Sequence, residues 1–267
     1  MIHLTCGYLN LAELDPAASI RAAAAGGFAA VGLRITGHRP GDAGPDIVGN
    51  RRATDELRKV LDDSGIALAN ISTYRFVPET TPSDYEPVLE AAAALGAGVM
   101  VANCFTPDEG LATENLATVC QLAGRFGIRV GLEFIPVSNV PTLERAAAIM
   151  SATRSPAAGL VIDALHLARS GGSPADVAAI DPALILAVQL CDAPLAAPAD
   201  LYAEMRAGRL YPGEGELPLA ALLDAIPAEG VEFEVEVPHL RVQGLSGDER
   251  ARRAHQATTA FLASLGR

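Results

Sequence analysis

The chain has 267 residues, of which 50% are hydrophobic and 19% are charged, and its formal net charge is −12 at pH 7. This composition is typical of a globular protein, and no Lys- or Arg-rich run suggests a nucleic-acid partner. The longest apolar stretch, residues 22–33, is too short to span a bilayer. The N-terminus lacks a basic start followed by an apolar core, so we expect a cytoplasmic protein without a signal peptide and without a membrane partner.

Short apolar runs recur along the chain and predict strands. In chain order they are residues 2–6, 30–35, 67–73, 99–104, 130–135, 160–164, 186–190 and 233–237. Several are nearly continuous in Val, Leu and Ile, as strands covered on both faces should be. The stretches between them are rich in Ala and Leu at helical spacing, and several end in glycine, a common helix C-cap.

The alternation of eight strands with helices predicts parallel pairing through crossover helices. A closed (β/α)8 barrel uses about 250 residues as one domain, which fits this chain. The alternative is an open doubly wound sheet. That fold favours a GxGxxG loop after its first strand, whereas this chain reads TCGYLN. We therefore expect a single α/β TIM barrel domain over residues 1–267.

Four oxygen-bearing side chains lie near the carboxyl ends of the last four predicted strands, where such barrels build their active sites. They are Glu133, Asp163, Gln189 and Glu236, and only closure of the barrel could bring them together. Three carboxylates at one mouth would repel one another, so we expect a divalent cation between them. An all-oxygen ligand set favours Mg²⁺, Mn²⁺ or Ca²⁺ over zinc.

Three of these residues also have a simpler interpretation. Asp163 could cap the helix that follows it, and Gln189 could be an interior amide that bonds to the backbone. Glu133 could be a paired core carboxylate, although a lone carboxylate in the apolar run VGLEFIP would be costly to bury. The four residues together indicate a metal site more strongly than any one of them does.

The last predicted strand offers three glutamates on one face. Glu232, Glu234 and Glu236 alternate along it and so point to the same side. We choose Glu236 as the metal ligand because it is nearest the carboxyl end. Glu234 is expected deeper in the barrel, close to the metal ligands or paired with a cation such as Arg34, and Glu232 at the solvated opposite rim.

Five motifs in the second half of the chain carry a resemblance to a known family. They are GLEFIP, VIDALHLARSGG, VQLCDAP, RLYPGEGELPL and VEVP, in this order. Together they resemble the sugar phosphate isomerase/epimerase family, the xylose isomerase-like TIM barrels. The resemblance implies a divalent metal, Mn²⁺ or Mg²⁺ with Co²⁺ as a further candidate, held by residues that match Glu133, Asp163, Gln189 and Glu236.

The resemblance also implies roles in the reaction. In the ketose 3-epimerases of this family the two ligand glutamates act as acid and base on opposite faces of the substrate, which assigns these roles to Glu133 and Glu236. His166 matches a residue that contacts substrate oxygens, and we interpret it as a substrate partner or proton shuttle rather than a helix-start histidine. Arg209, just before PGEG, matches an arginine that binds substrate near the metal.

Four more residues are candidates for substrate binding at the predicted mouth. Arg34 lies in the second predicted strand, Arg75 follows the third, and Asn103 ends the fourth. Arg34 could instead neutralise a carboxylate on the last strand. Glu214 of the PGEG stretch could orient Arg209 or could belong to a plain turn.

We expect a divalent-metal-dependent isomerase or epimerase that acts on a small sugar or keto-polyol by α-proton abstraction through a metal-stabilised enediolate. Gln189 stands where epimerases usually carry histidine, and QLCDAP is similar to a stretch of 3-dehydroshikimate dehydratases. Arg34 stands where many members of the family have an acid. A dehydratase of the 3-dehydroshikimate or inosose type is therefore the alternative, and a non-catalytic barrel that binds a sugar-like ligand is the second. The resemblance favours a homodimer.

Overall fold

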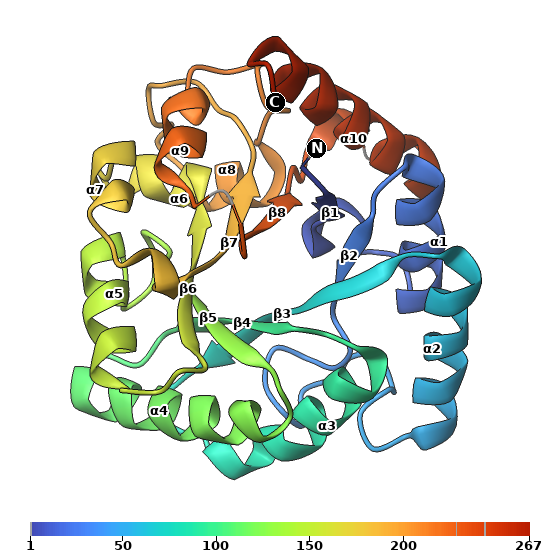
Figure 1. The fold of residues 1–267 in the computed structure, drawn as a ribbon, viewed down its shortest axis with the longest axis vertical. Coiled ribbons are helices and arrows are strands. Elements are labelled where there is room, and N and C mark those ends of the chain that lie inside the picture. The colour runs from blue at the N-terminus through green and yellow to red at the C-terminus, as the bar shows by residue number, and fades with distance from the viewer. Residues whose placement is uncertain (1, 228, 243) are drawn as a thin grey trace.

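Eight parallel strands form a closed barrel, and helices surround it (Figure 1). The computed structural model describes residues 2–227, 229–242 and 244–267. Each strand pairs with the next one in the chain, and the last strand pairs with the first. The strands are β1 (Leu4–Cys6), β2 (Ala30–Leu33), β3 (Ala67–Phe76), β4 (Val99–Cys104), β5 (Arg129–Glu133), β6 (Ala158–Asp163), β7 (Ile185–Leu190) and β8 (Glu232–Val235). The predicted (β/α)8 barrel is confirmed, and the open doubly wound sheet is excluded.

Helices connect the strands on the outside of the barrel. They are α1 (Pro16–Gly26), α2 (Arg51–Ser64), α3 (Glu86–Leu95), α4 (Glu109–Arg125), α5 (Leu143–Ala152), α6 (Ala164–Arg169), α7 (Pro174–Ala178), α8 (Leu201–Ala207), α9 (Leu219–Ala225) and α10 (Gly247–Ser264). The side chain of Asn50 caps α2, and Gly65 ends it with a left-handed φ of 65°. No helix among the described residues is both long enough and apolar enough to cross a membrane.

The interior of the barrel is filled by side chains. β6 and β7 are buried along their whole length, which explains why their sequences are nearly continuous apolar runs. Inside the ring, Val101, Val161 and Ala187 form a small cluster that is separate from the larger core between strands and helices. A filled interior leaves ligand binding to the strand ends and the loops that follow them.

The third strand is longer than predicted. β3 runs to Phe76 because its pairing with β4 continues as far as Cys104. Arg75 therefore lies within β3 and pairs in register with Asn103 of β4. The two residues sit side by side at the carboxyl ends of neighbouring strands.

Four strands, β2, β5, β6 and β8, end earlier than predicted, and in two of them a predicted site residue is left beyond the strand. β2 ends at Leu33, so Arg34 follows the strand rather than lying within it. β8 ends at Val235, so Glu236 is the first residue beyond it. Both side chains therefore start from the rim rather than from inside the ring of strands.

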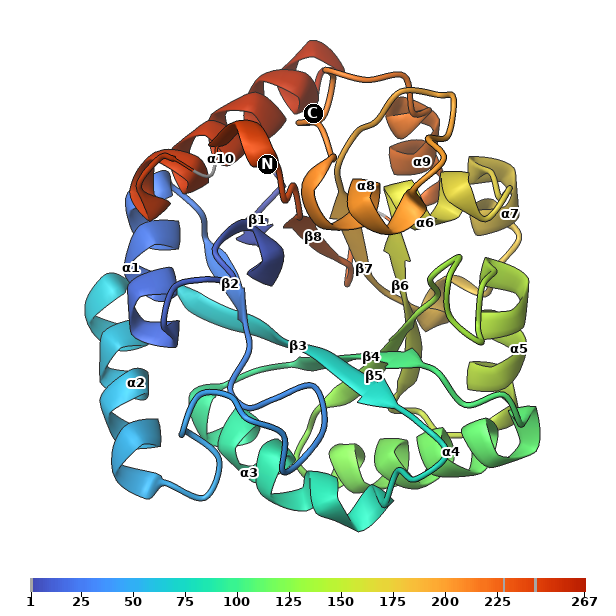
Figure 2. The same ribbon diagram turned by 180° about the vertical axis from the view of Figure 1, so that it is seen from behind.

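The connection between β7 and β8 covers part of the mouth. Figure 2 shows α8 in front of β7 and β8. A buried ion pair fixes this helix, because Arg169 at the end of α6 donates to both carboxylate oxygens of Glu204, at 2.8 and 2.7 Å. Two parallel bonds of this kind hold α8 in one orientation over the strand ends.

Candidate active site

A pocket of about 90 Å³ opens at the carboxyl ends of the strands. Seven of the predicted site residues line it, namely Arg34, Arg75, Asn103, Glu133, His166, Arg209 and Glu236. Larger hollows lie on the outer surface, such as one of about 470 Å³ beside α5 and α7, but their linings contain none of these residues. The strand ends thus place most of the predicted site around one space.

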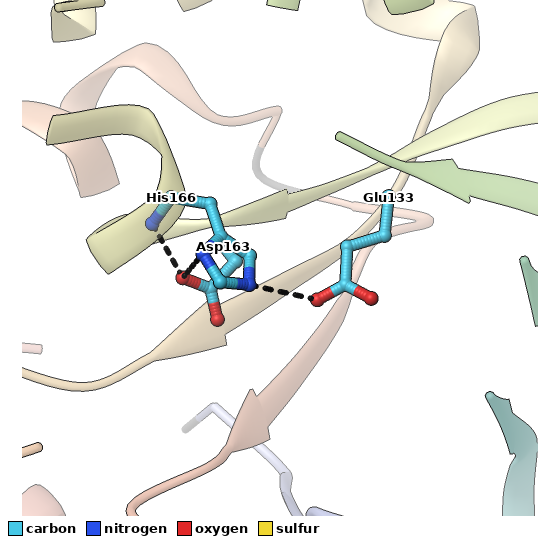
Figure 3. A group of neighbouring side chains, drawn as sticks. All are labelled: Glu133, Asp163 and His166. Atoms are coloured by element: carbon cyan, nitrogen blue, oxygen red, sulfur yellow. Dashed lines mark hydrogen bonds and ion pairs between the residues drawn. The ribbon is translucent and has the colours of Figure 1, made fainter. Parts of the chain in front are cut away.

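Glu133, Asp163 and His166 form a compact buried group (Figure 3). One ligand atom from each lies within 4.8 Å of the others. Nε2 of His166 is 3.5 Å from Oε1 of Glu133, and its Nδ1 is 3.9 Å from Oδ1 of Asp163. Asp163 also accepts the backbone N–H of His166 at 2.8 Å and so caps α6. The Asp163 carboxylate therefore both caps α6 and belongs to the buried group. Glu133, Asp163 and His166 could together hold a metal ion.

The positive charge that faces Asp163 in this structure belongs to Arg209. Its Nη1 donates to Oδ2 of Asp163 at 2.5 Å and lies 3.6 Å from Oε2 of Glu236, and the side chains are buried. Burial, the largest single effect, opposes the charge on Arg209, but Asp163, Cys191 and Glu236 together outweigh it and raise the pKa of Arg209 well above its usual value. Burial likewise acts to raise the pKa of Asp163, but Arg209 and His166 bring it below its usual value.

Arg209 therefore does more than the predicted substrate binding. Its Nε donates to the backbone oxygen of Met205 at 3.2 Å, and Nη1 also reaches the backbone oxygen of Glu236 at 3.3 Å. These bonds fix the guanidinium between the ends of β6 and β8, while it still lines the pocket. It supplies a positive charge beside Asp163, where the sequence indicated only a metal ion.

Gln189 is buried at the end of β7, in register with Asp163 on β6. Its Nε2 donates to Oε1 of Glu234 at 2.9 Å, whereas its buried Oε1 has no hydrogen-bond partner among the described residues. An unsatisfied buried acceptor is costly unless a ligand uses it. Nδ1 of His166 is also buried without a hydrogen-bond partner in the described part of the chain.

These donors fit a divalent cation, because carboxylates stand beside an imidazole and an amide oxygen with unused capacity. The set differs from the prediction in two respects. Glu236 lines the same pocket but is not among the three residues whose ligand atoms lie within 4.8 Å of one another. His166 adds a nitrogen next to Glu133 and Asp163, and nitrogen is a donor that zinc accepts readily. The group would therefore suit zinc as well as the Mn²⁺, Mg²⁺ or Co²⁺ expected from the sequence.

The lower glutamates of β8 are placed differently from the prediction. Glu232 is half-buried rather than solvated, and accepts from Nδ2 of Asn70 at 2.8 Å. Glu234 pairs with Asn70 and Gln189, not with Arg34. Asn70 reaches both acids because it lies opposite Gly32, where a Cβ would come within 2.7 Å of its Oδ1. These amides satisfy buried oxygens without adding a positive charge.

Burial also keeps protons on this row of carboxyl groups. It raises the pKa of Glu232 to about 7 and that of Glu236 to about 7. Burial, together with the negative charges of Glu236 and Glu232, raises the pKa of Glu234 well above its usual value. The interior of the barrel thus favours neutral carboxyl groups below the strand ends.

The opposite wall of the pocket is basic. The guanidinium carbon of Arg34 lies 4.4 Å from the ring centre of Tyr8, and its Nη1 is 3.0 Å from Nε2 of His38. Nδ1 of His38 is 3.2 Å from the backbone oxygen of Thr73. A neutral His38 that donates from Nδ1 and accepts at Nε2 satisfies both contacts. Burial, then the nearby Arg34 charge, lowers the pKa of His38, which keeps it neutral.

The sequence of this chain matches a known protein family. The model of the family described as "Xylose isomerase-like TIM barrel" matches residues 20–263. This chain belongs to the xylose isomerase-like TIM barrel family. The suspected resemblance is thereby confirmed, and it extends beyond the C-terminal motifs to nearly the whole barrel.

Individual relatives of this xylose isomerase-like barrel carry different names. A 3-dehydroshikimate dehydratase of Pseudomonas putida (strain KT2440) is 32% identical over 124 residues, which cover 46% of this chain and 19% of that protein. The crystal structure of the IOLI protein with a binding zinc atom superposes with a TM-score of 0.83 at 19% identity, over 99% of both chains. A D-allulose 3-epimerase from Methylomonas sp., in complex with D-allulose, gives 0.70 at 15% identity over 97% of both chains. The two structural likenesses show the shared fold.

Glu214 does not line the pocket of this xylose isomerase-like barrel, and its side chain is exposed, in line with the plain-turn alternative. The PGEG turn is held instead by Asp192. The Asp192 carboxylate accepts the backbone N–H groups of Gly213, Gly215 and Leu217, each at 3.0 Å. The sequence does contain this acid, in the VQLCDAP motif, but nothing local reveals partners more than 20 positions away.

Sequence reasoning also missed residues on the basic wall of this xylose isomerase-like barrel. Besides His38, the pocket is lined by Phe105 of the β4–α4 loop and by Tyr202 and Arg206 of α8. The sequence does indicate a long connection between β7 and β8, which contains α8, and its length could have suggested that α8 reaches the pocket. Asn103 lies where predicted, and its Oδ1 is buried without a hydrogen-bond partner in the described residues.

Proposed function

We propose that this xylose isomerase-like barrel is a divalent-metal-dependent isomerase or epimerase that removes the α proton of a small hydroxy-carbonyl compound. The observation that carries the proposal is the convergence of Glu133, Asp163 and His166 within 4.8 Å, beside a pocket that Glu236 also lines. Structural neighbours named as sugar epimerases share this fold, which supports the choice of reaction class.

Glu133, Asp163, Gln189 and Glu236 are the proposed ligands, and His166 is a further candidate donor. A bound divalent cation would polarise the substrate carbonyl and stabilise the charge that develops as the α proton leaves. Arg209 then serves as a positioning residue, because its bonds to Asp163 and Glu236 fix the directions of two ligand carboxylates.

Proton transfer is assigned to the two glutamates that line the pocket. Glu133 ends β5 and Glu236 follows β8, so they approach the pocket from different strands. One carboxylate takes the α proton, and the other returns a proton on the opposite face or at the neighbouring carbon. His166, 3.5 Å from Glu133, is placed to bond a substrate oxygen or to pass the proton on.

A dehydratase is the second candidate function. It is favoured by the sequence likeness to a protein named 3-dehydroshikimate dehydratase and by Gln189 in place of histidine. The same α-proton removal would then be followed by loss of a β-hydroxyl group rather than by return of the proton. The matched segment is only 19% of that relative, so the assignment depends on the experiment below.

Deuterium exchange tests the proposal directly. The protein is stripped of metal and reconstituted with Mn²⁺, Mg²⁺, Co²⁺ or Zn²⁺, and deuterium uptake from D₂O is followed with ketoses, inososes and 3-dehydroshikimate. We expect metal-dependent exchange at the α carbon of at least one compound, with Glu214→Gln as an active control. Net isomerisation or loss of water then identifies the reaction, and lack of exchange with every metal and compound would favour a non-catalytic binding barrel.

A further inference from the structure

Three arginines on one wall of the pocket have no acidic partner. Arg34 follows β2, Arg75 lies next to the last residue of β3, and Arg206 lies on α8, and all three line the pocket. Within the described ranges, none of them has a carboxylate oxygen within 4.0 Å. By contrast, the pocket's fourth arginine, Arg209, is paired with Asp163.

The contacts of Arg34 and Arg75 are all with neutral groups. Arg34 is bonded to His38 and to the backbone oxygen of Ser72, at 3.0 and 3.5 Å. Arg75 lies 4.6 Å from the ring centre of Phe105, and its buried Nε has no hydrogen-bond partner among the described residues. Contact with the aromatic rings of Tyr8 and Phe105 attracts the two guanidinium groups but supplies no negative counter-charge.

The three charges also act on one another. Burial and then the positive charges of Arg206 and Arg75 lower the pKa of Arg34, against the opposing effect of Tyr8. Like charges held together cost free energy unless an anion joins them. The protein as a whole has a net charge of −12, so gathering three unpaired arginines in one small pocket is a local exception.

We propose that Arg34, Arg75 and Arg206 bind an anionic group of the substrate, a carboxylate or a phosphate, while its carbonyl end faces Glu133 and Glu236. This inference rests on the proposed function for the carbonyl end only. Guanidinium groups bind such oxyanions through paired N–H donors. A volume of about 90 Å³ holds several water-sized groups, so the ligand is a small keto or hydroxy acid, or a small phosphate ester.

Binding calorimetry on the metal-reconstituted protein tests the inference without requiring turnover. The probes are 3-dehydroshikimate, inorganic phosphate and D-fructose. We expect at least one anion to bind at least tenfold more tightly than D-fructose. Arg75→Gln and Arg206→Gln should each weaken that anion roughly tenfold, as expected for loss of a charged hydrogen bond, and leave D-fructose unchanged. Arg206 is exposed, so its replacement leaves the core intact.

The matched control is Arg51→Gln, because Arg51 is an exposed arginine on α2 away from the pocket. It should bind every probe like the parent protein. Tighter binding of carboxylate or of phosphate names the anionic group, and either result supports the inference. Equal binding of anions and D-fructose would overturn it, as would an anion affinity that neither Arg75→Gln nor Arg206→Gln changes. Anion binding without deuterium exchange would instead reject the proposed reaction and leave this site in place.

Discussion

The two walls of the pocket carry opposite charges and balance them in different ways. On the acidic wall the charge of Asp163 is met inside the protein by Arg209, at 2.5 Å. On the basic wall Arg34, Arg75 and Arg206 have only neutral contacts within the described residues. The acidic wall therefore has an internal counter-charge at Asp163, whereas the basic wall has a counter-charge only when something negative enters.

Burial explains the difference. Asp163 and Arg209 are almost fully buried, where an uncompensated charge would cost several kcal/mol. Arg34 and Arg75 are only half-buried and Arg206 is exposed, so water solvates part of their charge when the pocket is empty. A protein can leave the second kind of charge unpaired and use it for recognition.

The largest loss of activity is expected from a change on the acidic wall, which consists of Glu133, Asp163 and Glu236. Glu236→Gln should lower α-proton exchange at least about a hundredfold, the usual scale for loss of a general acid or base, and should weaken metal binding. Glu232→Gln changes a residue four positions earlier, deeper in the barrel, and should alter the rate of α-proton exchange by no more than a few fold. Metal titration and deuterium uptake measure both. Equal losses would place the functional carboxylate deeper in the barrel than we propose.

The next effect concerns stability. Arg209→Gln leaves Asp163 buried without its counter-charge and should lower the free energy of unfolding of the metal-free protein by about 3–5 kcal/mol. Added Mn²⁺ should restore part of this loss, because a cation can replace the missing charge. Arg75→Gln on the basic wall is the control and should change stability by less than about 0.5 kcal/mol. Urea unfolding measures both, and the contrast between the walls fails if the two variants are equally destabilised.

A smaller effect should appear in the dependence of stability on pH. Burial raises the pKa of Glu232 from 4.5 to about 7. A raised carboxyl pKa contributes stability that is complete below about pH 4.5 and lost as the pH rises through about 7, on the order of 3 kcal/mol in all. Metal-free Glu232→Gln should therefore lose less stability than the parent protein between pH 5 and pH 8, as followed by urea unfolding. Identical pH profiles would show that Glu232 does not hold this proton.

The sequence is sufficient for the fold, because each strand and helix carries its own signal. Burial on both faces makes β6 and β7 readable as apolar runs, and glycines mark the ends of helices such as α2. Strand ends are less certain, since they depend on partners. β3 continues to Phe76 only because β4 supplies residues to pair with.

The site is predictable only in part for the same reason. Glu133, Asp163 and Glu236 stand out because acids are unusual at the ends of apolar runs. Their partners cannot be read locally, since Arg209 is 46 positions beyond Asp163 and the amide of Gln189 is turned by an acid on another strand. The unpaired state of the basic wall is likewise a property of the folded pocket.

The hydrogen bonds of Asp192 to the PGEG turn affect which parts of this barrel can tolerate a change of sequence or length. Besides its side-chain bonds, Asp192 forms a two-way backbone bridge with Leu210, at 2.9 and 2.8 Å. Residues 193–209 therefore form a loop whose two ends are joined by backbone hydrogen bonds next to the barrel. Residues can be inserted, deleted or exchanged in its exposed part, residues 196–200, beyond the bonds of Arg169 to the backbone oxygens of Pro194 and Leu195, while the strand register and the anchorage of Arg209 are preserved. This segment is thus a natural place for selection, or for a protein engineer, to alter substrate preference without rebuilding the scaffold.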